Sequence, residues 1–247
     1  MNKARSKPRC AFRASLAALA LCLLSFAATA EVPLRAYTAN YDLYRGGLHF
    51  ATAELALTPH RQLWRWRLTT RTRGIYTMFY DGKPYSEAIF AYGPDRMRLH
   101  SLELSDEEEV DERDYESARF DWQAGEMEVL RKGSLRQARL TADVYDYQTI
   151  HLLAAAMQLR GLKRATVRFY RKGKLVDSEL TYLGNSAIEF GGEKIDARVY
   201  EQTVERSRTV ARYYYDARNP LLPLRVESRK GDDEPTILQL REVSWRS

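Results

Sequence analysis

The four histidines are the most versatile chemical groups in this sequence, because imidazole binds metals and exchanges protons near neutral pH. His49, His60, His100 and His151 are scattered, and no two have the spacing of ligands to one metal ion. The sequence contains no Gly-x-Ser-x-Gly motif and no glycine-rich phosphate-binding loop. We interpret His151 as a polar residue on the flank of a predicted helix. The sequence therefore predicts a protein that is not an enzyme and holds no metal or cofactor.

Aromatic side chains suggest a different chemistry, the binding of an apolar ligand. The chain has 16 Tyr and 4 Trp residues, and aromatic side chains line pockets for apolar ligands. They also fill the cores of β-proteins, so core packing is the alternative interpretation. The candidate residues for binding a lipid or another hydrophobic ligand are Trp64, Trp66, Leu68, Phe120, Trp122, Ile150, Leu153 and Met157.

A short apolar segment, residues 74–80, joins two predicted strands. Its apolar residues are Ile75, Tyr76, Met78 and Phe79. They form either a lid over one mouth of the sheet, which could also contact a partner protein, or a buried corner.

The first thirty residues have the three parts of an export signal. A basic start precedes an apolar run at 14–26, and Ala28-Thr29-Ala30 supplies the small residues of a cleavage site. The apolar run is too short for a membrane anchor, and no second hydrophobic span follows. We predict a cleaved signal peptide over residues 1–30 and a location in the periplasm.

Cleavage at residue 30 changes the composition of the chain. Five of the 39 Lys and Arg residues precede the cleavage site and all 33 Asp and Glu residues follow it, which leaves 34 basic and 33 acidic residues. This near-neutral balance gives no support for nucleic-acid binding. Cys10 and Cys22 both lie in the signal, so the mature chain has no disulfide. We expect residues 31–247 to form a single β-rich domain.

Alternating apolar and polar residues dominate the chain after residue 36. In Trp64-Arg65-Trp66-Arg67-Leu68 the apolar side chains share one face, as in half-buried antiparallel strands. The alternation changes phase around His100 and again after Leu240, which predicts bulges that bend the sheet. The predicted strands cover 37–44, 47–57, 62–72, 84–92, 95–104, 109–122, 126–131, 164–171, 174–183, 186–190, 193–205, 209–216, 221–228 and 236–246.

One segment, at about 146–160, has the pattern of a long helix. Asp146 suits the N-cap and Gly161 suits the position after the last turn. Its apolar residues surround the helix almost completely, which predicts that the helix is buried. We therefore expect a mainly β fold, a strongly curved antiparallel sheet (half-barrel or open barrel) that encloses or is capped by this helix. A sandwich of two flat sheets is the alternative, although its thin core has no room for a helix.

The chain also resembles a known family through four segments in a fixed order: Tyr37-Thr38-Ala39-Asn40-Tyr41, residues 71–80, the helix end at 158–161, and residues 220–227. It is similar to the bacterial periplasmic family catalogued as domain of unknown function 3108. The resemblance implies an envelope location in a Gram-negative bacterium and supplies no catalytic residues. By analogy of fold, it is similar to the half-barrel carriers of lipoproteins and lipids, although this chain has one long helix where such carriers have several lid elements.

Two hypotheses for function follow. In the first, the protein binds a lipid or acyl chain between the concave face of the sheet and the helix. In the second, it is a structural or adaptor protein of the envelope, with a self-filled core and a protein partner. An empty apolar cavity would favour the first hypothesis, and a filled concave face the second.

Overall fold

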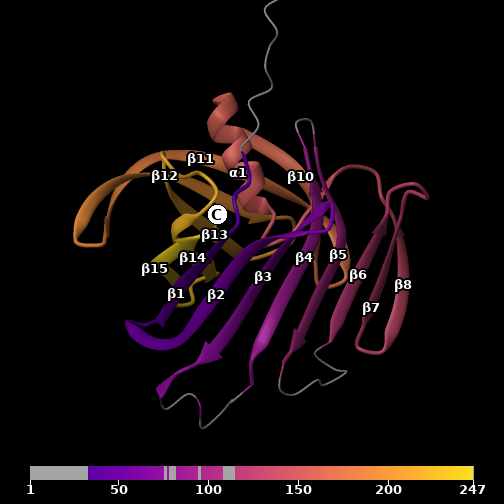
Figure 1. Cartoon of the computed structure of the whole chain (residues 1–247), viewed down its shortest axis with the longest axis horizontal. Helices are drawn as coiled ribbons and strands as arrows, with labels where there is room; N and C mark the ends of the chain where they lie inside the picture. Colours follow the sequence, from indigo (N-terminus) through magenta and orange to yellow (C-terminus); the bar gives the residue numbers. More distant parts are fainter. Residues whose placement is uncertain (1–32, 75–76, 78–81, 94–95, 108–114, 247) are drawn as a thin grey trace, which may run out of the picture.

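The computed structural model describes residues 33–74, 77, 82–93, 96–107 and 115–246. In this part of the chain the strands form one 15-stranded sheet, accompanied by one helix, α1 (Figure 1). The strands are β1 (Tyr37–Arg45), β2 (Leu48–His60), β3 (Leu63–Thr72), β4 (Pro84–Tyr92), β5 (Met97–Asp106), β6 (Glu116–Asp121), β7 (Glu126–Arg131), β8 (Ser134–Arg139), β9 (Val144–Tyr145), β10 (Arg164–Arg171), β11 (Lys174–Phe190), β12 (Glu193–Val204), β13 (Thr209–Asp216), β14 (Pro223–Lys230) and β15 (Thr236–Trp245).

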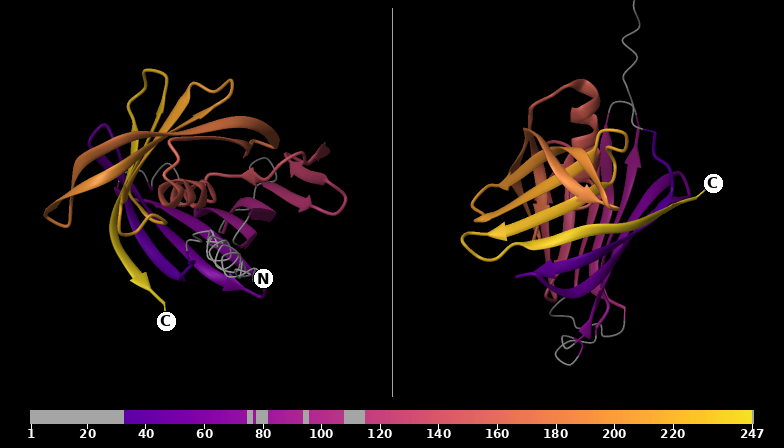
Figure 2. Two further views of the ribbon diagram at one scale, coloured as in Figure 1. Left: turned by 90° about the horizontal axis from the view of Figure 1, so that it is seen from above. Right: turned by 90° about the vertical axis from the view of Figure 1, so that its left-hand side faces the viewer.

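The sheet consists of two meanders joined at its middle. One arm runs from β1 to β8 and the other from β15 to β9, and the first and last strands pair with each other. Neighbouring strands are antiparallel except β9 and β10. The sheet curves around α1 without closing into a barrel, and β8 and β9 are its edges (Figure 2). The predicted curved antiparallel sheet is confirmed, and the sandwich alternative is wrong because the strands form one continuous sheet.

Both predicted bulges are present. Ile89 and Phe90 pair with Ser101 and Leu99, so His100 is the extra residue in β5. On β15, the register shifts in the same way at Arg241, which lies between the partners of Asn40 and Tyr41. An extra residue changes which face the following side chains occupy and increases the local bend. These bulges therefore explain the change of phase in the sequence and contribute to the curvature.

The strand predictions differ from the structure where the apolar alternation is weak or interrupted. The six residues of β8 are all exposed, so this edge strand carries no apolar pattern, and it was not predicted. The two-residue β9 lies in the segment before the predicted helix. The predicted strands 174–183 and 186–190 are one strand, β11, which passes through a bulge at Gly184 with a φ of 112°.

The helix α1 spans Ile150–Arg160, so it begins one turn later than predicted. Residues 147–149 form a turn, and Asp146 stabilises it from the predicted capping position. Its carboxylate accepts a hydrogen bond from the backbone N–H of Thr149 at 2.8 Å, while Thr149 Oγ1 accepts one from the N–H of Asp146 at 2.9 Å. This reciprocal pair is a capping box. The helix ends at Gly161, whose φ of 65° is the left-handed conformation that glycine adopts at little cost.

The helix is buried because both arms of the sheet pack against it. Leu152 and Ala155 belong to a hydrophobic cluster built mainly by β1–β7. Ile150, Ala154 and Met157 belong to a second cluster, with residues of β10–β13. The view from above in Figure 2 shows α1 between the two arms, on the concave side of the sheet. Contacts on opposite sides explain why the helix is apolar almost all round, and they confirm its predicted burial.

A buried carboxylate connects the two arms near the open side. Glu116 on β6 is 7% exposed. It accepts hydrogen bonds from Tyr170 Oη at 2.7 Å and from the N–H of Gly173 at 3.1 Å, and it pairs with Arg131 of β7. Tyr170 belongs to β10 and Gly173 to the turn between β10 and β11. Side chains, rather than strand pairing, thus hold the arms together here.

Among the described residues, no helix has the length and hydrophobicity required to cross a membrane. The predicted signal peptide, residues 1–30, lies outside the described residues. Cleavage and export stay predictions.

Candidate ligand-binding cavity

A cavity of about 180 Å³ lies on the concave face of the sheet, next to the N-terminal end of α1. Tyr147, Gln148 and His151 form its wall on the helix side. Tyr147 is also 54% exposed, so this part of the wall lies at the protein surface. For comparison, an apolar cavity of roughly 150 Å³ accepts a benzene molecule. The space is therefore large enough for a small apolar group or a segment of a chain.

The two arms of the sheet supply the apolar walls. Leu55 and Leu68 project from β2 and β3, and Val204, Val226 and Leu238 from β12, β14 and β15. Side chains on alternate positions of these strands share the concave face, which brings residues far apart in sequence to one cavity.

Small and polar residues line the remaining part, near strand ends. Arg171 is the last residue of β10, Thr209 is the first residue of β13, and Ser207 lies in the turn before it. Ser228 lies on β14, where it pairs with Ala211 of β13. We call Arg171, Ser207, Thr209 and Ser228 the polar rim. These half-buried residues place hydroxyl groups and one cation in the lining of a mainly apolar cavity.

His151 lies inside the protein, contrary to its interpretation as a residue on the helix flank. It is 6% exposed, and its Nδ1 is 2.8 Å from Tyr215 Oη. Its ring packs edge-on against Trp66 and Tyr213, at centroid distances of 5.7 and 5.2 Å. Burial lowers the pKa of His151 to about 3, because a charged imidazolium is poorly solvated among aromatic rings. His151 is therefore neutral at physiological pH.

The other polar side chains deep in the wall are paired within the protein. Tyr213 Oη donates a hydrogen bond to Gln202 Oε1 at 2.6 Å, and Gln202 Nε2 donates to Ser178 Oγ at 3.0 Å. Tyr41 Oη donates to the carbonyl oxygen of Pro223 at 2.9 Å. Burial raises the pKa of Tyr41 and of Tyr213, so both phenols stay neutral.

Gln148 differs from these residues because one of its polar atoms has no partner. The side chain is 3% exposed, and its Nε2 donates to the carbonyl oxygen and to Oγ of Ser86, at 2.8 and 2.9 Å. Its Oε1 is buried and has no hydrogen-bond partner among the described residues. Gln148 thus contributes to the cavity wall, but its unpaired oxygen is enclosed by the protein and exposes almost no surface.

The predicted ligand-binding residues are divided between the cavity and the core. Leu68 lines the cavity. Trp66 is fully buried, and its Nε1 donates to Tyr37 Oη at 3.1 Å. Phe120 and Trp122 stack with their centroids 6.5 Å apart, in the cluster built mainly by β1–β7. Trp64 packs against the same cluster, whereas Ile150, Met157 and Leu153 belong to or pack against the second cluster.

Sequence reasoning did not identify Gln148, His151 or Tyr213 as cavity residues. The available signal was the position of Gln148 and His151, two polar residues three positions apart at the start of an apolar helix. Ile75, Tyr76, Met78 and Phe79, the predicted lid or partner contact, lie outside the described residues.

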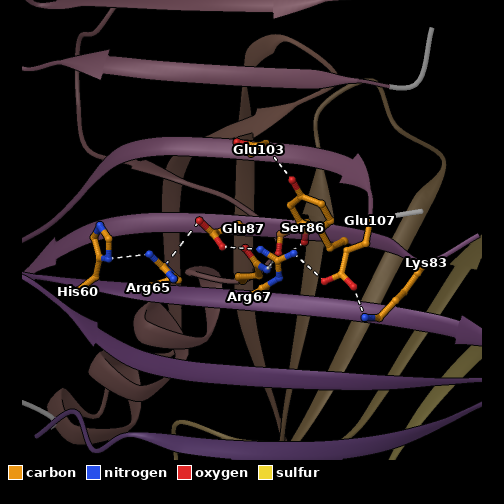
Figure 3. A network of polar contacts seen from close by, with 10 residues as sticks. His60, Arg65, Arg67, Lys83, Ser86, Glu87, Glu103 and Glu107 are labelled. Atoms are coloured by element: carbon orange, nitrogen blue, oxygen red, sulfur yellow. Dashed lines mark hydrogen bonds and ion pairs between the residues drawn. The ribbon is translucent and has the colours of Figure 1, made fainter. Parts of the chain in front are cut away.

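The outer face of the sheet around β3 carries paired charges. Arg67 of β3 contacts Glu87 at 2.9 Å and Glu107 at 2.8 Å, while Lys83 pairs with Glu107 and Arg65 lies 3.7 Å from Glu87 (Figure 3). These arginines alternate with the inward-facing residues of β3, as predicted. Among the described residues, no group of three or more His, Cys, Asp or Glu side chains is placed to hold a metal ion.

Comparison with known proteins agrees with the observed architecture. A family described as protein of unknown function (DUF3108) matches residues 37–233. No curated protein matches the chain. The crystal structure of a β-barrel-like protein of domain of unknown function DUF1849 from Brucella abortus is similar, with a TM-score of 0.56 and 11% identity over 87% of this chain and 100% of that chain. An exported protein with a YmcC-like fold from Bacteroides fragilis aligns over 87% of this chain and 98% of its own, with 5% identity and a TM-score of 0.32. The similarity to the DUF1849 protein shows a shared fold.

Proposed function

Because the chain belongs to the DUF3108 family of proteins of unknown function, we propose its function from the cavity itself: it binds an apolar ligand, with an acyl chain as the natural one. In this proposal the protein is a non-catalytic periplasmic carrier. The ligand occupies the space between the N-terminal end of α1 and the concave face of the sheet.

The observation that carries this proposal is the apolar cavity of about 180 Å³. An adaptor with a self-filled core has no need of such a space on its concave face. Burying an apolar ligand against these walls contributes about 25 cal/mol per Å² of apolar area, before the cost of ordering the ligand.

The polar rim supports a ligand that has one polar end. An acyl chain in the apolar part would place its head group near Arg171 and the hydroxyl groups of the rim. In this proposal, a chain longer than the cavity extends past Tyr147, whose side chain is 54% exposed.

The proposal is tested by filling the cavity from its wall. Ala211 is half-buried and lines the cavity, so Ala211→Phe places a ring in the space that the ligand would occupy. Ala187→Phe on β11 is the matched control, because Ala187 is exposed and lies outside the cavity. p-Xylene is the probe in NMR titrations, and native mass spectrometry examines protein purified from a bacterial envelope.

We expect wild type and Ala187→Phe to bind p-xylene and to retain an acyl-containing molecule. Ala211→Phe should lose both while keeping its circular dichroism spectrum. Wild-type protein that neither binds p-xylene nor retains any lipid would overturn the proposal.

A further inference from the structure

We infer that the protein docks on a membrane surface that contains anionic phospholipids, through exposed leucines and cations at the C-terminal end of α1. These residues are Leu159, Arg160, Leu162, Lys163 and, from β11, Leu183. We call them the docking patch. The inference is separate from ligand binding in the cavity and does not depend on it.

The three leucines of the docking patch are exposed to solvent. Leu159, Leu162 and Leu183 are 46%, 47% and 50% exposed. Leu159 belongs to the last turn of α1, and Leu162 follows Gly161, the residue after the helix. Single exposed leucines are common on protein surfaces, whereas several in one place mark a site of interaction.

Backbone hydrogen bonds bring Leu162 and Leu183 together. The N–H of Tyr182 donates to the carbonyl oxygen of Lys163 at 2.8 Å, which continues the antiparallel register of β10 and β11 by one step. In this register Leu162 stands opposite Leu183, and opposite residues place their side chains on the same face. The N–H of Leu162 also donates to the carbonyl oxygen of Met157 at 2.9 Å, which holds Leu162 against the end of the helix.

The docking patch lies where the helix projects from the sheet. Figure 1 shows one end of α1 above β11 and β12. Ile150, at the start of the helix, is fully buried, whereas Leu159 and Arg160, at its end, are exposed, so the projecting end is the C-terminal one. A projecting end can touch a flat surface such as a bilayer before the rest of the molecule does.

The charge around these leucines is positive. Residues 147–176 contain seven Lys and Arg residues and no Asp or Glu, although the chain after residue 30 is almost neutral. Arg160 and Lys163 are exposed, and neither has an ion pair with any residue that the structure describes. Lys163 Nζ instead lies 4.0 Å from the centre of the Tyr182 ring. Cations without counter-ions favour an anionic surface as the partner.

The combination of leucines and cations fits a phospholipid bilayer. Leucines bury apolar area at the boundary of the acyl chains, while lysine and arginine lie near the phosphates of the head groups. A second copy of this chain is a poorer partner, because Arg160 and Lys163 of the two copies would repel each other.

The experiment measures binding of residues 31–247 to sedimented vesicles. One set of vesicles is phosphatidylcholine alone, and the other contains equal parts of phosphatidylcholine and phosphatidylglycerol. The apolar variant is Leu162→Ser/Leu183→Ser. Its matched control is Leu48→Ser/Leu135→Ser, because these leucines are 60% and 61% exposed and lie outside the docking patch.

A second pair of variants tests the charges. Arg160→Gln/Lys163→Gln removes two cations of the docking patch. Its matched control is Arg136→Gln/Arg139→Gln, which removes two exposed cations from the edge strand β8. The two charge variants have the same net charge, so a difference between them reports the position of the cations.

Wild type and both controls should bind the mixed vesicles and bind phosphatidylcholine vesicles more weakly. On mixed vesicles, we expect the apolar variant to lose affinity about tenfold, because two half-exposed leucines no longer bury their area. The charge variant should lose affinity about thirtyfold on mixed vesicles, which removes the preference for them.

Three results would overturn the inference. They are wild type that does not bind mixed vesicles, wild type that binds both kinds of vesicle equally, and controls that lose as much affinity as the variants of the docking patch. A patch that serves an acidic protein partner gives the first result. Ala211→Phe, which fills the cavity, should dock like wild type, so failure of docking and failure of ligand binding are separate outcomes.

A fluorescent label reports contact with the bilayer directly. Residues 31–247 contain no cysteine, so Leu162→Cys provides a single attachment site for an environment-sensitive dye. Its emission should shift to the blue on addition of mixed vesicles, whereas the same dye on Leu135→Cys should not respond. Equal responses at the two positions would contradict docking through this patch.

Discussion

The hydrogen bonds of Glu116 predict a large loss of stability when this carboxylate is removed. Glu116 joins β6 of one arm to Tyr170 and Gly173 of the other, and it also pairs with Arg131. In Glu116→Ala, the buried Tyr170 hydroxyl and the Gly173 N–H lose their acceptor, and Arg131 loses its counter-charge. The arms would then be held in this region by apolar contacts alone.

The expected magnitude follows from the burial of the group. Removing one partner of a buried charged pair costs about 3–5 kcal/mol, because the remaining groups stay desolvated. Glu116 is 7% exposed, but the Arg131 side chain is 34% exposed and regains water, so we expect the low end, about 3 kcal/mol. For a chain of this size that lowers Tm by about 6–12 °C. Glu116→Gln keeps an acceptor for Tyr170 and Gly173, and should cost about 1 kcal/mol.

Urea unfolding followed by tryptophan fluorescence and circular dichroism gives the free energies of unfolding. Asp177→Ala is the control on the neighbouring β11, because the Asp177 side chain is 54% exposed and its pair with Arg168 should contribute less than about 1 kcal/mol. The reasoning is refuted if Glu116→Ala and Asp177→Ala lose the same small amount. Hydrogen exchange should also accelerate in β10 of Glu116→Ala and not in Asp177→Ala.

Two further predictions concern α1. His151 has its folded-state pKa lowered to about 3 from 6.5, so only the unfolded chain takes up this proton between these values and stability falls as the pH drops through this window. His151→Gln should therefore weaken the pH dependence of the free energy of unfolding between pH 6 and 4, by at most about 1.4 kcal/mol per pH unit. Urea unfolding measured at each pH tests this, and parallel curves for the variant and wild type would contradict the burial of His151. Met157→Ala, at a fully buried position, should lower the free energy of unfolding by about 2–5 kcal/mol. Leu159→Ala, at a position 46% exposed, should lower it by less than about 1 kcal/mol. Equal losses in urea unfolding would contradict the packing of the helix between the arms.

The features that could be predicted from the sequence are those in which the type of each residue, apolar or polar, matches its own buried or solvated position. Trp66 alternates with arginines because one face of β3 is buried and the other is solvated. The phase change at His100 follows from a bulge that is local to β4 and β5. The apolar circumference of α1 follows from contact with both arms. In each case the pattern of apolar and polar residues along one strand or helix contains the structural information.

The features that escaped prediction depend on residues that meet only in three dimensions. β8 lacks a buried face, so its sequence has no apolar pattern although its backbone pairs with β7. The contact of Glu116 with Tyr170 joins positions 54 residues apart. The free oxygen of Gln148 is apparent only when Ser86, 62 residues away, is placed beside its NH₂ group. Pairings of this kind leave no periodic trace in the sequence.

The location of the cavity follows from where the helix stops filling the concave face. Along α1, apolar residues from Ile150 to Met157 occupy the space between the arms. Before the helix, the chain offers Tyr147 and Gln148, and the facing strands carry small residues such as Ala211 and Ser228. Small side chains opposite the end of a helix leave volume that close packing fills elsewhere in a protein. A protein under selection for stability alone would gain by enlarging these residues, so their small size is consistent with a space kept for a ligand.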